Sequence, residues 1–381
     1  MNRKVLAAGM AAVMMASAVL GGCSSSSGSS AGGNGGTEAK QETQAPVTKE
    51  EAPAAKEEVQ APAAGDAGGT TEEAKSQEPV GDLVEFRLVS PYDTNTSMLQ
   101  AAQGFVDELA EKSGGTLKGT IYAAGVMGGE QETLEAVQMG EVEMTVMGTY
   151  PIVTLAPKYG FFDAPFVFRD KEHYFNTWEG KLGDEVREVF ANNNIHTVGL
   201  MGRGYRHITS NDPIHSVEDL KGMKMRMGQS TPFINAFTEI GAVVVPISLT
   251  ELFTSLQMGV VSASEGPFDQ IYSYKLYEVQ DQLALSGHLY ATSLWLTNSS
   301  FYDRLSDGQK EIFDTCAEKW LAEGTKLSDQ AEEDLLQTLK DEGMEVTEPD
   351  PEAIRQKALP AISRMFETDW TVTSIEEIEK Y

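Results

Sequence analysis

Cysteine, basic residues and long apolar segments are scarce in this sequence. Only two of its 381 residues are cysteines, which excludes a disulfide framework and a thiolate metal site. Lys and Arg number 29 against 58 Asp and Glu, a formal net charge of −29, so nucleic acid is not expected as a partner. Beyond the N-terminus no apolar run reaches the roughly 20 residues that a membrane-spanning helix needs. The 41% of hydrophobic residues, at this length, allows two domains with ordinary cores.

Motifs of the common enzyme classes are also missing. Residues 81–381 contain no G-x-S-x-G, Walker loop, H-E-x-x-H or C-x-x-C. Cys316 lies among apolar helical residues and is expected to be a small buried side chain. The histidines show no metal-ligand spacing: His173, His196, His207, His215 and His288. We therefore expect no cofactor, no metal and no enzymatic activity, and a lipid-anchored hydrolase has no visible nucleophile and base.

The N-terminus has the pattern of an export signal. Arg3 and Lys4 precede the apolar run 5–20, so residues 1–22 are predicted to be a signal peptide. The run ends in Leu20-Gly21-Gly22-Cys23, which resembles a bacterial lipobox, where a lipid is attached to the cysteine. This pattern predicts a lipoprotein held by acyl chains, palmitate among them, at the extracytoplasmic face of the cell membrane. The alternative is an ordinary secretory signal with an incidental cysteine.

A polar segment follows the predicted lipidation site. Residues 24–79 contain no aromatic residue, Leu, Ile or Met, and are rich in Ser, Gly, Ala, Glu, Thr and Pro. Such a composition cannot bury enough apolar surface to offset the entropy of ordering. Residues 23–80 are therefore predicted to be the lipidated cysteine and a disordered acidic tether. The remainder, 81–381, carries 23 Lys and Arg against 48 Asp and Glu, a net charge of −25.

The pattern of residues 81–381 alternates between strands and helices. Strands are predicted at 83–89, 117–123 and 143–147, and helices at 98–109 and 131–139. This order predicts an α/β fold with a largely parallel sheet. A helical pattern from about 306 to 340 would be roughly 50 Å long, which exceeds the width of a small domain. We therefore expect two α/β lobes with a cleft between them and a long helix that bridges the lobes.

Helix-capping signals mark the second half of the chain. Ser216-Val217-Glu218-Asp219 and Ser248-Leu249-Thr250-Glu251 have the spacing of capping boxes. Thr231-Pro232 predicts an N-cap followed by proline at the first helical position. Gly259 is predicted to end a helix that contains residues 252–258.

Arginines are the distinctive feature of this acidic chain. Met223-Lys224-Met225-Arg226-Met227 alternates, so a strand would carry the Met side chains on one face and the basic ones on the other. Gly202-Arg203-Gly204-Tyr205-Arg206-His207 places two arginines among glycines. A guanidinium binds a carboxylate at two points, and glycine allows close backbone approach. Solvated surface charges paired with acidic side chains are the alternative interpretation.

At these residues the sequence resembles the substrate-binding proteins of tripartite ATP-independent periplasmic (TRAP) transporters, in the dicarboxylate-binding-protein family and in a lipoprotein form. The resemblance runs over residues 83–345. It is carried by these stretches: Gly128-Gly129-Glu130, 134–140 (LEAVQMG), 164–170 (APFVFRD), Gly204-Tyr205-Arg206, 219–226 (DLKGMKMR), 251–261 (ELFTSLQMGVV) and 277–280 (YEVQ).

The resemblance implies a two-lobed, periplasmic-binding-protein-like clamp that closes on a small organic acid and delivers it to TRAP permease subunits in the membrane. Arg226 would be the principal carboxylate anchor and Arg206 the second one. Lobe I would comprise residues 82–203 and 292–331, and lobe II residues 204–291 and 332–381. A monomer is expected.

The sequence departs from the family pattern where other parts of the ligand would bind. Residues 262–267 read SASEGP where relatives usually read DGQENP, so Gly266 replaces a ligand-contacting Asn and offers only backbone. Gly148 stands where sialic-acid binders carry Glu, which argues against sialic acid. Both losses predict a larger or less polar pocket, filled by water or by Phe268. Arg203, at a position that is usually uncharged, is either a contact for a second acidic group or a surface ion pair.

Further site residues are carried over from the resemblance. Positions 92, 149, 229 and 288 correspond to the cleft of relatives, so the expected contacts include Tyr92, Thr149, Gln229 and His288. Glu265, in the 262–267 stretch, is expected to be a contact as well. The acid itself stays open at this point: a C4-dicarboxylate, a sugar acid, a keto acid and an aromatic acid all fit. The alternative function is a ligand-binding surface sensor that acts on a signalling receptor instead of a permease.

Overall fold

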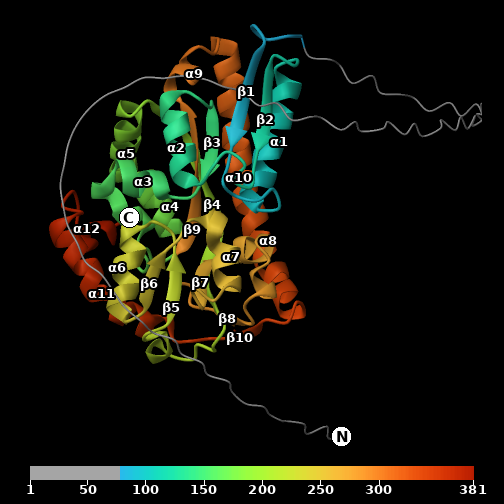
Figure 1. The fold of residues 1–381 in the computed structure, drawn as a ribbon. Helices are drawn as coiled ribbons and strands as arrows, with labels where there is room; N and C mark the ends of the chain where they lie inside the picture. Colours follow the sequence, from blue (N-terminus) through green and yellow to red (C-terminus); the bar gives the residue numbers. More distant parts are fainter. Residues whose placement is uncertain (1–77) are drawn as a thin grey trace, which may run out of the picture. The chain divides into compact units, whose positions relative to one another are not determined.

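The computed structural model describes residues 78–381, drawn in colour in Figure 1. The predicted signal peptide, Cys23 and nearly all of the predicted tether lie outside the described residues. Val80 is held against the folded part, because its backbone N–H donates to the carbonyl of Ser113 (3.0 Å) and its carbonyl accepts from the Thr116 hydroxyl (2.6 Å). No helix within 78–381 combines the length and the apolarity needed to cross a membrane.

Strands and helices alternate along most of the described chain. The strands are β1 Val84–Val89, β2 Leu117–Tyr122, β3 Met144–Met147, β4 Ile195–Ser210, β5 Lys224–Met227, β6 Val243–Pro246, β7 Ala263–Pro267, β8 Gln282–Ala284, β9 Tyr290–Asn298 and β10 Glu345–Thr347. The helices are α1 Ser97–Lys112, α2 Glu130–Met139, α3 Tyr150–Leu155, α4 Lys171–Trp178, α5 Lys181–Asn192, α6 Thr231–Ile240, α7 Leu252–Gln257, α8 Phe268–Ser273, α9 Ser299–Asp303, α10 Asp307–Asp341, α11 Pro351–Thr368 and α12 Ile375–Ile378. Short 3₁₀ turns lie at η1 Pro157–Asp163, η2 Val217–Leu220, η3 Leu249–Glu251 and η4 Leu276–Glu278.

The sheet has two halves that share strand β4. Strand order is β2-β1-β3-β9-β4-β7-β5-β6, with β8 paired to β4 and β10 paired to β8. The first half comprises β1, β2, β3 and β9, and the second half comprises β5, β6, β7, β8 and β10. Residues 195–205 of β4 pair with β9, whereas residues 206–210 pair with β7. One continuous strand of 16 residues therefore connects the two halves.

The predicted two-lobed α/β fold is confirmed, but the sheet is less parallel than expected. Strand β1 is parallel to β2 and β3, and β5 is parallel to β6 and β7. The central strands β4 and β9 are antiparallel to each other and to their other neighbours β3 and β7. Strand β4 was not predicted from the sequence, because its register shifts between Thr197 and Gly199 and between Gly202 and Gly204, which breaks the period of two.

Long helices cover both halves of the sheet. Helix α1 buries Met98, Ala102, Phe105 and Leu109, whose spacing follows one face of a helix. The predicted long helix is confirmed as α10, whose 35 residues would span about 52 Å. It packs against α1, β4 and α8, and in Figure 1 it runs beside both halves. Helices α6 and α11 pack against each other beside the second half.

Two capping predictions were wrong in detail. Ser230, not Thr231, is the N-cap residue of α6, and its side chain makes no capping hydrogen bond because its hydroxyl donates to Asp163 (2.6 Å). The Ser248 hydroxyl lies 3.0 Å from the Glu251 carboxylate, and this sequence forms a 3₁₀ turn before α7. The Ser216 box forms, but it begins only the 3₁₀ turn η2. In this chain the capping sequences mark where a helical turn begins, but they do not indicate the length of the helix that follows.

Candidate functional site

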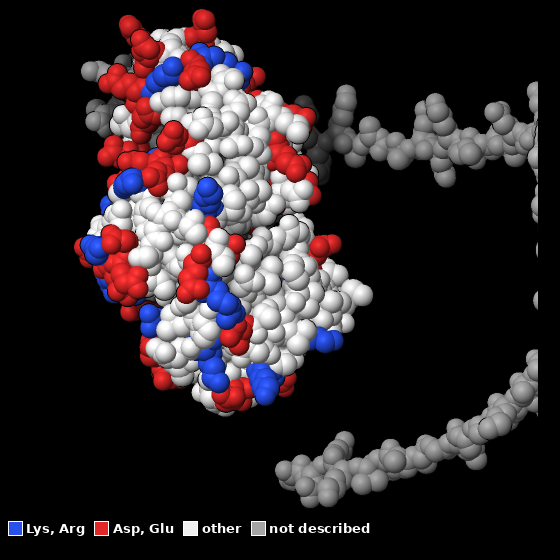
Figure 2. Space-filling view, turned by 90° about the vertical axis from the view of Figure 1, so that its left-hand side faces the viewer, with Lys and Arg blue, Asp and Glu red and all other residues white. Residues whose placement is uncertain are grey.

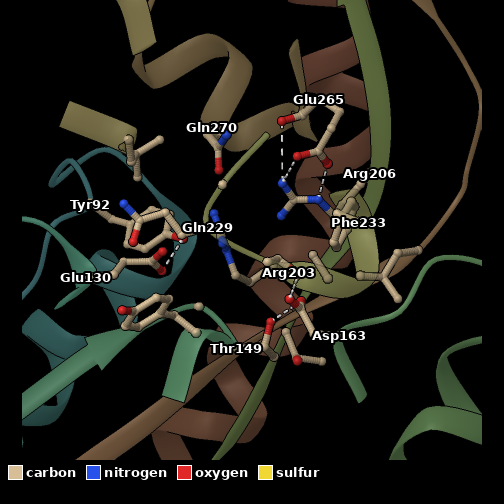
Figure 3. Close-up of a pocket in the computed structure, with 18 of the residues that line it drawn as sticks. Tyr92, Glu130, Thr149, Asp163, Arg203, Arg206, Gln229, Phe233, Glu265 and Gln270 are labelled. Carbon is tan, nitrogen blue, oxygen red and sulfur yellow. Dashed lines mark hydrogen bonds and ion pairs between the residues drawn. The ribbon is translucent and has the colours of Figure 1, made fainter. Parts of the chain in front are cut away.

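A cavity of about 60 Å³ lies where the two halves of the sheet meet (Figure 3). Its wall includes residues from β4 and β5, from the N-terminal end of α2, and from the segment around η1. Six ionisable side chains, three basic and three acidic, face it together with Tyr92 and Tyr150: Arg203, Arg206, Arg226, Glu130, Asp163 and Glu265. A buried space with this many charges is typical of a ligand site.

Arg226 lies on β5 and is 3% exposed. The alternation of β5 buries Met225 and Met227 on one side and turns Arg226 into the cavity, which excludes the solvated-surface alternative for this residue. Its Nε donates to the carbonyl of Ile247 (2.9 Å), and within residues 78–381 no carboxylate forms an ion pair with it. Burial lowers the pKa of Arg226, and the nearby charges of Glu265 and Glu130 offset this effect only in part.

Arg206 and Glu265 form a two-point ion pair across β4 and β7. Arg206 Nη2 lies 2.7 Å from Glu265 Oε1, and Nε contacts Oε2. Burial alone would raise the pKa of Glu265, but the charge of Arg206 and hydrogen bonds from His288 and Arg206 hold it well below its usual range. Both partners therefore stay ionised, and the pair fixes the orientation of Arg206.

His288 contacts the Glu265 carboxylate of this ion pair and does not itself line the cavity. Its Nε2 lies 3.2 Å from Glu265 Oε2, and its Nδ1 lies 2.8 Å from the hydroxyl of Ser286. The side chain is fully buried, and burial lowers the pKa of His288. The neutral ring with a proton on Nε2 satisfies both contacts, so His288 donates to Glu265 and accepts from Ser286.

Arg203 is buried between two partners. Its Nη2 lies 3.4 Å from Asp269 Oδ1, and its guanidinium carbon lies 4.6 Å from the centre of the Tyr92 ring. The Arg203 side chain is 1% exposed and that of Asp269 is 6% exposed. The alternative of a surface ion pair for Arg203 is therefore wrong. Asp269 also accepts from the Ser97 hydroxyl (3.0 Å), which fixes the carboxylate behind Arg203.

The opposite wall carries Tyr92 and Glu130. The Tyr92 hydroxyl donates to Glu130 Oε1 at 3.2 Å, and both groups face the cavity (Figure 3). Glu130 is the first residue of α2, where the N-terminal backbone N–H groups favour a negative side chain. Burial raises the pKa of Glu130 despite the arginines nearby.

Asp163 joins segments on two sides of the cavity. It accepts hydrogen bonds from the hydroxyls of Thr149, which precedes α3, and Ser230, which precedes α6. Burial raises the pKa of Asp163 from 3.8 to about 6. The contact with Ser230 joins η1 to the second half of the sheet, because α6 follows directly after β5.

Two glycines leave space that other polar side chains fill. A Cβ atom on Gly148 would lie 2.9 Å from the Tyr92 hydroxyl and 3.0 Å from Glu130 Oε1. A Cβ atom on Gly266 would lie 2.7 Å from the amide nitrogen of Gln270. The space next to both glycines is thus occupied by polar side chains, and not by Phe268. Carboxylate and amide groups are present, but they come from other backbone positions.

The structure brings most of the predicted site residues to one cavity. Seven of the ten line it: Tyr92, Thr149, Arg203, Arg206, Arg226, Gln229 and Glu265. Three others do not. Gly266 is buried in β7, His288 lies behind Glu265, and the ring of Phe268 stacks on His207 at 4.5 Å instead of filling the cavity. Phe268 does not take the place of the missing side chains.

Several cavity residues were not identified from the sequence. They include Glu130, Asp163, Ser230, Phe233 and Gln270. Glu130 belongs to the Gly128-Gly129-Glu130 stretch, and Asp163 directly precedes the Ala164-Pro165-Phe166 stretch. Both residues could therefore have been identified as candidates from the stretches that carry the family resemblance. Gln270 lies outside every stretch that carries the family resemblance, so the sequence did not indicate it.

Two further features of the described residues concern metal binding and thiol chemistry. Within 78–381 no three His, Cys, Asp or Glu side chains gather in a way that could hold a metal ion. Cys316 is buried in α10, and burial raises the pKa of its thiol, which disfavours the reactive thiolate.

Comparison with known proteins identifies relatives of this fold. Residues 90–369 match the family model described as bacterial extracellular solute-binding protein, family 7. The 2,3-diketo-L-gulonate-binding periplasmic protein of Escherichia coli is 29% identical over 73% of this chain and 86% of its own length.

Two solved structures match over nearly their full length. A TRAP periplasmic solute-binding protein from a Bordetella species, with density interpreted as pantoate, is 30% identical with a TM-score of 0.73 and covers 77% of this chain and 98% of its own. A second from Polaromonas, bound to D-erythronate, is 27% identical with a TM-score of 0.73 and covers 77% of this chain and 97% of its own. The chain thus belongs to family 7 of the bacterial extracellular solute-binding proteins, the family of TRAP substrate-binding proteins.

Proposed function

We propose that this protein is the extracytoplasmic solute receptor of a TRAP-type secondary transporter, and that it binds a small organic acid through Arg226 and Arg206. The observation that carries the proposal is the guanidinium of Arg226, which is 3% exposed, faces the cavity and has no acidic partner within residues 78–381. A buried unpaired charge is costly, and a ligand carboxylate would supply the missing partner.

The cavity wall supports a mechanism of clamp closure. Arg226 and Arg206 come from β5 and β4, whereas Tyr92, Glu130 and Asp163 come from segments before and after β3. A ligand that touches both groups holds them together, and it therefore favours the closed arrangement over an open one. The closed arrangement is the state that we propose the permease subunits recognise.

The relatives support an organic acid as ligand. Pantoate, D-erythronate and 2,3-diketo-L-gulonate, named for three of them, all carry one carboxylate. No observation favours the surface sensor over the transport receptor, and it is not proposed. We retain as proposals the lobe boundaries, with lobe I at 82–203 plus 292–331 and lobe II at 204–291 plus 332–381.

The anchor is tested by the loss of one charge. Arg226→Gln removes the cationic partner while keeping a polar side chain, so calorimetric titration with any acid that binds the wild type should show at least a hundredfold weaker binding. Arg364→Gln is the matched control, because Arg364 is an arginine whose side chain is 59% exposed on α11. Unchanged affinity in Arg226→Gln would remove the proposed anchor.

We further propose that Cys23 carries the lipid that holds the protein at the extracytoplasmic face of the cell membrane, and that the protein acts as a monomer, since one chain supplies the whole cavity wall. Cys23→Ala should move the protein from the membrane fraction to the soluble fraction. An unaltered distribution after fractionation would contradict the lipid anchor.

A further inference from the structure

Residues 369–381 connect the two halves of the molecule outside the cavity. Helix α11, which precedes them, packs against α6 beside the second half of the sheet. After α11 the chain passes to α4 and forms α12 there (Figure 1). Helix α4 packs on the first half, because its Tyr174 hydroxyl accepts from Thr292 of β9 (3.1 Å). We call residues 369–381 the strap, since they begin on one half of the molecule and continue onto the other.

The strap binds α4 through backbone carbonyls. His173 is buried, and its Nδ1 accepts from the backbone N–H of Arg169 (3.1 Å), so the ring carries its proton on Nε2. Nε2 donates to the carbonyl of Ile378 (2.8 Å), and the Arg169 guanidinium donates to the carbonyl of Glu379 (3.0 Å). The Ile378 side chain is buried, so apolar contact adds to these hydrogen bonds.

Trp370 joins the strap to a segment that leads to the cavity. Its ring is buried, and the ring centre lies 6.2 Å from that of Phe161 in η1. Gly160 makes room for this contact, because a Cβ atom there would lie 2.8 Å from the indole nitrogen. Two residues after Phe161, Asp163 faces the cavity and accepts from Ser230 (2.6 Å). The strap and the Asp163–Ser230 hydrogen bond therefore both hold η1 in place.

Separation of the two halves would strain the strap. Helix α11 would move with α6, whereas His173 would move with β9. The chain between them can lengthen by straightening the turn in which the Thr373 N–H donates to the Trp370 carbonyl (3.4 Å). A larger movement must pull α12 from α4, which exposes Ile378 and breaks the hydrogen bond to His173. The contacts of the strap thus belong to the arrangement in which the halves lie together.

We propose that the strap stabilises the closed clamp and leaves α4 when the clamp opens. This inference rests on the proposed function, because it concerns the closure by which the solute would be held. None of residues 369–381 lines the cavity, so the strap acts on the balance between open and closed arrangements and not by contact with the solute.

A double variant tests the strap in the protein without solute. Ile378→Ala removes a buried side chain of the strap, and Arg169→Ala removes a donor to its backbone. Val372→Ala combined with Arg355→Ala is the matched control, because Val372 is a 37% exposed residue of the strap and Arg355 is a partly exposed arginine of α11. Hydrogen exchange of the full chain, measured by mass spectrometry, compares both variants with the wild type.

Release of the strap should expose the cavity wall to exchange. Residues 224–230 carry Arg226 and Gln229 of the cavity and lie outside the strap, so their exchange should be about threefold faster in Ile378→Ala/Arg169→Ala. The control variant should match the wild type, and residues 84–89 of β1 should exchange alike in all three proteins. Unchanged exchange of residues 224–230 would overturn the inference. An effect of equal size in the control or in residues 84–89 would overturn it too, because the change would then not be specific to opening of the clamp.

Solute affinity gives a second measurement. In a calorimetric panel of malate, D-erythronate, glucuronate and pyruvate, each acid that binds the wild type should bind Ile378→Ala/Arg169→Ala about threefold more weakly, because a smaller fraction of the variant is closed. Unchanged affinity would contradict a role of the strap in closure. Absence of binding to every acid by the wild type would count against the proposed function alone, because the exchange measurement needs no solute.

Discussion

Charged side chains behave differently in the cavity and on the surface of this protein. In the cavity, the side chains of Arg206 and Glu265 are 15% and 2% exposed and form a two-point pair. On the surface, Arg364 contacts Glu239 with side chains 59% and 31% exposed. Figure 2 shows one face of the molecule, where acidic and basic residues are scattered between uncharged ones.

The difference shows why net charge is a poor guide to this ligand site. The excess of acid in residues 81–381 gives a net charge of −25, which would repel an anion from a distance. The charged side chains around the cavity are buried, so their interactions are screened less than in bulk water, and local ion pairs decide which charges are compensated. One unpaired guanidinium can therefore bind an acid within a strongly acidic protein.

The largest change in stability is expected when the buried ion pair between Arg206 and Glu265 is broken. Glu265→Gln leaves Arg206 buried without its counter-ion, so the free energy of unfolding should fall by about 3–5 kcal/mol. Chemical denaturation measures this change. A loss below about 1 kcal/mol would place the buried pair in the same class as a surface pair.

A double variant sharpens this prediction. Arg206→Met combined with Glu265→Leu removes both charges, so the desolvation cost disappears together with the attraction, and most of the lost stability should return. Binding of the acid should nevertheless stay weak, because Arg206 is gone. Stability as low as in Glu265→Gln alone would contradict the explanation by an unpaired charge.

The second effect is a pH dependence of stability. Burial raises the pKa of Asp163 to about 6, so the native state binds this proton more tightly than the unfolded chain, whose carboxyl titrates near 3.8. Its contribution is fully present below pH 4 and is lost as the pH rises to about 6, a change of at most about 3 kcal/mol.

Asp163→Asn isolates this contribution. Glu130 and Arg206 also face Asp163, and their own titration is common to both proteins. The difference in unfolding free energy between wild type and Asp163→Asn, measured from pH 4 to pH 8, should therefore change mainly between pH 4 and pH 6. A difference that stays constant over this range would contradict the raised pKa.

A smaller effect is expected at the glycine that makes room for Glu130. Gly148→Ala places a Cβ atom 2.9–3.0 Å from Tyr92 and Glu130, so these flexible side chains must shift, and acid binding should weaken several-fold with a loss of about 1 kcal/mol in stability. Gly228→Ala is the control, because Gly228 also lines the cavity but a Cβ there meets no atom within 4 Å. Equal stability losses in the two variants would argue against the close packing at Gly148.

The smallest effect is expected on the surface. Arg364→Gln removes an exposed pair with Glu239 and should change stability by no more than about 1 kcal/mol, with a smaller change at high salt. Thermal unfolding at two salt concentrations measures this. A loss of more than about 2 kcal/mol in the free energy of unfolding, independent of salt, would show that this surface ion pair stabilises the protein as much as a buried one and would contradict the comparison.

Much of the fold and part of the site follow from the sequence, for physical reasons. The helical spacing of Phe105 and Leu109 and the alternation around Arg226 are local patterns, and the structure confirms the elements that they predict. The position of the Glu130 side chain next to Gly148 depends on packing between segments that are distant in the sequence, so a local pattern does not predict it. A missing side chain is visible in a sequence, but the side chain that takes its space is not.

Arg203 and Arg206 lie on β4 close to the point where this strand changes its pairing partner. The change of pairing partner from β9 to β7 falls between Tyr205 and Arg206, next to Gly204, whose φ of +86° and close approach to Glu332 suit glycine alone. Any rotation of one sheet half against the other must bend this stretch of backbone, together with the segment between β8 and β9 and with α10. In the proposed mechanism, the arginine that binds the solute and the backbone that bends during closure are therefore neighbours in β4, and a substitution in one is expected to alter the other.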